Sequence, residues 1–115
     1  MQRAGNSRKM SLMDTPRYLC SQLVRLWISG ASDGGEQWAN LEEIWNSGAV
    51  LECEEAVDTG AMARMSSEEV SFEGRVTAVE QHEFGWRVEL AFSPPALWSI
   101  EQWRPEHALD PNTLR

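Results

Sequence analysis

The sequence predicts a small all-β domain, because short stretches of alternating apolar and polar residues are separated by turn-forming residues along most of its length. The chain has 115 residues, of which 42% are hydrophobic and 24% are charged. These values are typical of a soluble globular protein with one domain. Residues 1–16 are polar and show no periodic pattern, so we expect a flexible basic N-terminal arm before one folded domain over residues 17–115.

Three strands are predicted in the first half of this domain. Residues 18–28 alternate with a period of two, which indicates a strand rather than a helix. The following SGASDGGE tolerates positive φ, so we expect the chain to reverse into a second strand at residues 37–45. A turn at residues 46–48 then leads to a third strand at 49–54. The residues expected on the buried faces of the first and third strands are Val24, Leu26, Ile28, Ala49, Leu51 and Cys53.

The second half of the domain shows the clearest alternation. A short strand is predicted at residues 61–65, and a long antiparallel hairpin is predicted from residues 70–78 and 86–92. The apolar side of this hairpin consists of Val70, Phe72, Val76, Ala78, Trp86, Val88, Leu90 and Phe92. Five or six strands at such short spacing predict a barrel or a sandwich.

A short C-terminal helix is expected after the last strand. Pro94 and Pro95 end that strand, because proline cannot donate to a sheet. Ser99 and Gln102 then have the spacing of a capping box, and Pro105 limits the helix to one or two turns.

Most of the tryptophans and both cysteines are interpreted as structural. Aromatic rings could stack on a base or bind a peptide, but burial in the barrel or under the helix explains them more simply. Trp27 and Trp45 are the two for which we expect partial exposure. Cys20 and Cys53 lie far apart and form no CxxC, so we expect reduced, buried thiols. The six tryptophans are Trp27, Trp38, Trp45, Trp86, Trp98 and Trp103.

The charge distribution argues against nucleic acid as a partner. The net charge is −8, and the first 17 residues carry +3 from four basic residues and one aspartate, which leaves −11 for the rest. A body this acidic repels a phosphate backbone, so neither DNA nor RNA is expected as a partner. No apolar stretch is long enough to span a membrane and no secretory signal is recognisable, so we expect a cytoplasmic protein.

No catalytic or metal-binding pattern is recognisable in the sequence. His82 and His107 are the only histidines, and neither has a Cys or His at ligand spacing, so no metal site is expected. The sequence also lacks a nucleophile motif of the G-x-S-x-G type and a phosphate-binding P-loop. We therefore expect a protein that is not an enzyme.

The segments LEEIWNSGAVLECEEAVDTGAMARM and VSFEGRVTAVEQHEFGWRVELAF, at residues 41–65 and 70–92, resemble a PilZ domain in motif order and strand pattern. PilZ domains are barrels closed by a C-terminal helix, and many bind cyclic di-GMP in bacteria. The resemblance implies a small antiparallel six-stranded PilZ-like β-barrel with a short C-terminal helix over residues 17–115.

The ligand motifs of that family are incomplete here. In the motif [D/N]-x-S-x-x-G, Glu43 stands at the first position, Trp45 at the serine and Gly48 at the glycine, so that only the glycine matches. The second motif, R-x-x-x-R, is absent, because serines follow Arg17 and Arg25 at the fourth residue. A bidentate arginine clamp on a phosphate is therefore missing.

Two hypotheses about function follow from the resemblance. The first is a non-catalytic bacterial signalling domain, a degenerate PilZ-like adaptor that binds a protein partner not identified by the sequence. The alternative is a cyclic di-GMP receptor that uses a non-standard site together with the basic N-terminal arm. In either case the protein needs no cofactor, and cyclic di-GMP is considered only as a regulatory ligand. The candidate binding residues are Arg17, Arg25, Glu43, Trp45 and Gly48.

Overall fold

The computed structural model describes residues 16–30, 35–94 and 97–109 of the chain. Within these residues the secondary structure consists of six strands joined by turns and loops. The strands are β1 (Tyr18–Ile28), β2 (Glu36–Trp45), β3 (Gly48–Cys53), β4 (Met62–Ser66), β5 (Ser71–His82) and β6 (Gly85–Phe92).

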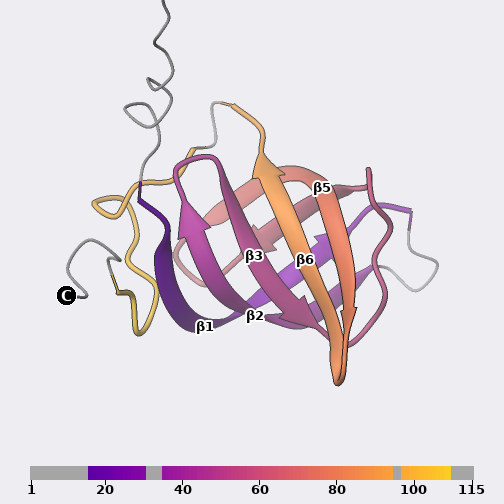
Figure 1. Ribbon diagram of the computed structural model, residues 1–115. Helices are drawn as coiled ribbons and strands as arrows, with labels where there is room; N and C mark the ends of the chain where they lie inside the picture. Colours follow the sequence, from indigo (N-terminus) through magenta and orange to yellow (C-terminus); the bar gives the residue numbers. More distant parts are fainter. Residues whose placement is uncertain (1–15, 31–34, 95–96, 110–115) are drawn as a thin grey trace, which may run out of the picture.

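The six strands form one closed barrel in the order β1-β2-β3-β6-β5-β4 (Figure 1). Every pair of neighbouring strands is antiparallel. The predicted small antiparallel six-stranded barrel is therefore confirmed. Every strand therefore has a neighbouring strand on both sides, so none of the six is an edge strand of the sheet.

Strand β1 closes the barrel, because it pairs with β2 along its length and with β4 along its second half. The pairing with β4 runs from Arg25, opposite Ser66, to Ile28. A register shift between Leu19 and Gln22 interrupts the pairing with β2. Such an irregularity bends a strand, and here it lies in the first half of β1, before the pairing with β4 begins at Arg25.

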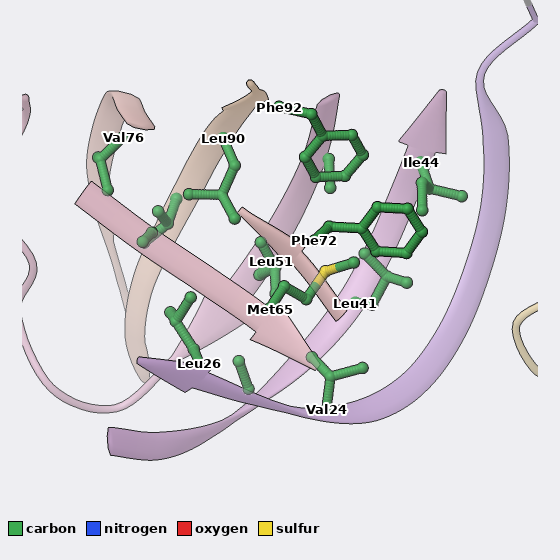
Figure 2. Close-up of a cluster of buried hydrophobic side chains, with 14 of the residues drawn as sticks. Val24, Leu26, Leu41, Ile44, Leu51, Met65, Phe72, Val76, Leu90 and Phe92 are labelled. Atoms are coloured by element: carbon green, nitrogen blue, oxygen red, sulfur yellow. The ribbon is translucent and has the colours of Figure 1, made fainter. Parts of the chain in front are cut away.

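The inward-facing side chains of all six strands fill the barrel (Figure 2). The predicted inward positions of β1 and β3 are confirmed, since Val24, Leu26 and Leu51 are at most 1% exposed. Phe72 and Phe92 stack with their ring centroids 5.0 Å apart. Among the described residues no polar or charged residue is buried, so the interior is held by apolar packing and sheet hydrogen bonds.

One predicted inward residue faces outward instead. Ala78 was expected on the same buried face as Val76, but it is exposed in the structure. The cause is a register shift between these two residues in the pairing of β5 with β6. An extra residue in a strand reverses the alternation beyond it, and Val79 accordingly packs against the core in place of Ala78.

The C-terminal segment covers one end of the barrel with two buried tryptophans. The indole Nε1 of Trp98 donates to the carbonyl oxygen of Trp103 over 2.8 Å, and the Trp103 ring lies 6.4 Å from that of Phe72. The predicted cap is present, because the Gln102 amide donates to Ser99 Oγ over 3.2 Å. However, the described residues 97–109 form turns and no helix. Pro105 prevents this turn from continuing into a helix, because a proline disfavours the helical conformation in the residue before it.

Several expectations fall outside the described residues. These are the arm up to residue 15, residues 31–34 of the first hairpin turn, and Pro95. The described residues include no helix with the length and apolarity that a membrane span requires.

We expect Leu51→Ala to lower the free energy of unfolding by about 2–5 kcal/mol, because Leu51 is fully buried and its truncation leaves a cavity. Urea denaturation followed by tryptophan fluorescence measures this. Leu23→Ala is the matched control, since Leu23 is 57% exposed and its loss should change stability by no more than about 0.5 kcal/mol. Equal destabilisation by the two substitutions would contradict the inward direction assigned to Leu51.

Candidate functional site

Four of the five predicted site residues meet at the end of the β2–β3 hairpin. Trp45 and Gly48 are directly paired across a two-residue turn. Leu19 pairs with Glu43, so the start of β1 lies beside the end of β2 and places Arg17 next to the same turn. The antiparallel register therefore brings together residues up to 31 positions apart in the sequence.

The ring of Trp45 occupies the space directly over Gly48. A Cβ atom at Gly48 would lie 2.7 Å from Cζ2 of Trp45 and 2.5 Å from the carbonyl oxygen of Leu90. Both distances are shorter than a side chain can tolerate, so only glycine permits this approach of the indole and of the β6 backbone. The lack of a side chain at Gly48 thus makes room for the indole of Trp45.

Arg17 completes the cluster by binding both neighbours. Its guanidinium carbon lies 3.8 Å from the centroid of the Trp45 ring, and its Nη1 lies 3.3 Å from Oε1 of Glu43. The Arg17 side chain is 54% exposed and that of Glu43 is 20% exposed. At such exposure the cation–π contact contributes about 0.5–1 kcal/mol and the ion pair about 0–1 kcal/mol. Arg17 is therefore held in place, but weakly.

Arg25 belongs to a different part of the surface. It pairs with Glu36 at 3.2 Å and lies 4.6 Å from the ring centroid of Trp38, its direct partner in the register. Eight residues along β1 separate it from Arg17, and each adds about 3.3 Å. The structure thus does not join the two predicted arginines into one site.

The arrangement of an arginine between an indole and a carboxylate occurs a third time. Arg64 on β4 lies 5.0 Å from the ring of Trp27 on β1 and 3.7 Å from a carboxylate oxygen of Glu73 on β5. Sequence analysis missed this group, because only the pairing of β1 and β5 with β4 brings its members together. Trp27 and Trp45 are partly exposed, as expected, while Trp98 and Trp103 are buried.

Sequence analysis also missed the most exposed apolar side chains. Leu23, Trp38 and Phe84 are 57%, 54% and 88% exposed, and they line one hollow of about 520 Å³. A second hollow of about 780 Å³ is also lined by Leu23 and Trp38. Alternation could have identified Trp38, because it precedes the buried Ala39 and so must face outward.

Acidic side chains cover the outer face between β2 and β5. Burial and the nearby carboxylate of Glu52 raise the pKa of Glu42, although Arg87 at 3.2 Å opposes this effect. His82 Nδ1 lies 3.0 Å from Glu52, and His82 Nε2 lies 3.6 Å from Glu80. Despite this density, the described part of the chain contains no group of three or more acidic, histidine or cysteine side chains arranged to hold a metal ion.

The two cysteines are free thiols in shielded positions. Cys53 is buried and Cys20 is partly buried. Burial, with a smaller effect of Glu43, raises the pKa of Cys20 to about 12. Burial also raises the pKa of Cys53 to about 11. Both thiols are therefore protonated and weakly nucleophilic at neutral pH.

Comparison with known proteins gives no relative: neither a protein-family model nor a curated protein sequence matches this chain.

The raised thiol pKa values predict a specific loss of stability in alkali. An unfolded thiol ionises near pH 8.5, so above that pH the unfolded chain releases its protons first, and the free energy of unfolding falls until pH reaches the folded pKa of about 11 for Cys53. Urea denaturation at several pH values measures this slope. The Cys20→Ala/Cys53→Ala double variant should lose less stability over the same pH range. Identical slopes would contradict the shielding of both thiols.

Proposed function

We propose that this chain is a non-catalytic, PilZ-like signalling domain of the bacterial cytoplasm that acts as an adaptor for a protein partner. The observation that carries this proposal is the Trp45 ring over Gly48, held against Arg17 and Glu43. A phosphate-binding site needs free, convergent donors. In this cluster the guanidinium of Arg17 already contacts the indole of Trp45 and the carboxylate of Glu43.

Charge supports an adaptor over a nucleotide receptor. Cyclic di-GMP carries two phosphates, and residues 18–115 carry a net charge of −11, which disfavours the approach of an anion. The second predicted arginine, Arg25, is engaged with Glu36 and Trp38. Protein interfaces, in contrast, are enriched in exposed aromatic side chains and arginine, which this barrel carries on its outer face.

One observation favours the alternative, a cyclic di-GMP receptor that uses a non-standard site. Arg17 is half exposed, and its two contacts together contribute only about 0.5–2 kcal/mol. A phosphate could replace them. In that case Arg17 would turn from Trp45 toward the ligand, and the basic arm before it would supply further positive charge.

Isothermal titration separates these two functions. We expect no heat of binding when the purified full chain is titrated with cyclic di-GMP to about 500 µM, which corresponds to a binding free energy weaker than about −4.5 kcal/mol. A dissociation constant below about 10 µM for the unaltered chain would overturn the adaptor proposal.

A gain-of-binding variant tests whether Trp45 and the missing arginine are the obstacles. Trp45→Ser with Ser21→Arg restores the hydroxyl of the family motif and an arginine four residues after Arg17. We expect this double variant to bind cyclic di-GMP more tightly than the unaltered chain in the same titration, because both a hydrogen-bonding group and a second cation are supplied. Met62→Ser with Ser71→Arg alters exposed residues of β4 and β5 and serves as the control for charge. Equal gains in both variants would contradict a specific site at Trp45.

A further inference from the structure

Three exposed apolar side chains from two strands and a turn line one hollow on the barrel. Leu23 comes from β1, Trp38 from β2, and Phe84 from the turn between β5 and β6. The β5–β6 hairpin extends beyond the rest of the barrel at the bottom of Figure 1. These are three of the largest exposed apolar groups of the described residues. Such a contiguous apolar patch on a soluble protein is typical of an interaction surface.

The rim of this hollow is acidic. Its lining includes Glu52, Glu54 and Glu55, and no basic residue. Of these, Glu52 is paired with His82. Glu54 and Glu55 are exposed and make no ion pair within the described part of the chain. Their charges are therefore available to a partner.

The second hollow continues the surface on the other side of Leu23 and Trp38. Its lining contains Glu68, Glu69 and Glu106, together with Arg25 and Arg104. The charge of Arg25 is already balanced by Glu36 at 3.2 Å. Arg104 is exposed and offsets one of the three glutamates, so this margin keeps a net negative charge. Leu23 and Trp38 thus lie between two acidic margins.

We propose that this surface binds a segment of a partner protein that carries Lys or Arg on both sides of an apolar side chain. The surface consists of three apolar and four acidic residues, Leu23, Trp38, Phe84, Glu54, Glu55, Glu68 and Glu69. The inference rests on the proposed adaptor function and specifies its partner. Charge complementarity selects a basic segment, and the exposed indole and phenyl rings provide the pocket for an apolar anchor. Because every strand already has two neighbouring strands, we expect recognition through side chains rather than through strand addition.

A second copy of this chain fits the surface less well. Each copy carries a net charge of −8, and two such surfaces face to face would bring like charges together, which costs free energy. The basic arm predicted at residues 1–16 is another basic segment to be tested as an occupant. The experiment below distinguishes both occupants from a partner segment.

Fluorescence anisotropy with a synthetic peptide tests the proposal. The probe is a fluorescein-labelled peptide of about twelve residues that alternates lysine with leucine, and the reference is the same peptide with glutamate for lysine. We expect the lysine peptide to bind the full chain and the glutamate peptide not to bind. Affinity should fall severalfold between about 50 mM and about 500 mM NaCl, because the rim charges are exposed and screened.

Variants with matched controls localise the binding. The double substitution Trp38→Ser/Phe84→Ser should lower the affinity for the lysine peptide about tenfold or more. Met62→Ser, at another exposed apolar residue, should leave this affinity unchanged. Likewise, Glu54→Gln/Glu55→Gln should lower the affinity for the peptide. Asp58→Asn/Glu101→Gln changes the net charge by the same amount and should not lower the affinity. Equal losses in test and control variants would show diffuse attraction to an acidic protein and would overturn the proposal.

Two further outcomes would assign the surface to another occupant. If the peptide binds only after residues 1–14 are deleted, the chain's own arm covers the surface. If the chain elutes as a dimer that Trp38→Ser converts to a monomer, the occupant is a second copy. The titration with cyclic di-GMP separates this inference from the proposed function. If neither the peptide nor cyclic di-GMP binds, only the proposed binding surface is overturned. If cyclic di-GMP binds, the proposed adaptor function itself is overturned.

Discussion

The pairing of β1 with both β2 and β4 is the constraint on which the rest of the structure depends. Because β1 contacts two neighbours, the sheet has no free edge, and the inward side chains of all six strands share one apolar interior. The same strand carries Leu23 and Arg25 on its outer face, where they alternate with the buried Val24 and Leu26. Because every strand is paired with two neighbours, we expect a partner to be recognised by outward side chains and not by the main chain. The outer positions of β1 and β2 therefore decide what this barrel can bind.

Alternation in the sequence was sufficient to predict the strands, but not their irregularities. The inward direction of Leu26 and Leu51 follows from a period of two, because an apolar side chain every second residue can be buried only in a half-covered strand. The register shift after Val76 has no such signal, since Ala78 is as apolar as an inward residue would be. The expected helix was also overestimated, because the capping pattern at Ser99 describes how a turn begins but not how far it continues.

Only the part of the candidate site whose residues are close in the sequence could be predicted. Trp45 and Gly48 flank a two-residue turn, so their contact follows from hairpin geometry. The approach of Arg17 to Trp45 depends on the register between β1 and β2, which the sequence does not specify across the intervening loop. The same register separates Arg25 from this cluster and places it over Trp38. The sequence analysis grouped the two arginines as candidate binding residues, whereas strand pairing places each beside its own tryptophan and carboxylate.

These arginine pairings also determine the electrostatic character of the outer face. Arg17, Arg25 and Arg64 each neutralise a carboxylate on a neighbouring strand, and each stacks on an indole. Single exposed pairs add little stability, but together they remove cations that could attract a phosphate. The carboxylates left unpaired, among them Glu54 and Glu55, then dominate the field around Leu23, Trp38 and Phe84. The arrangement that weakens the case for an anionic ligand is therefore the one that makes this surface complementary to a basic segment.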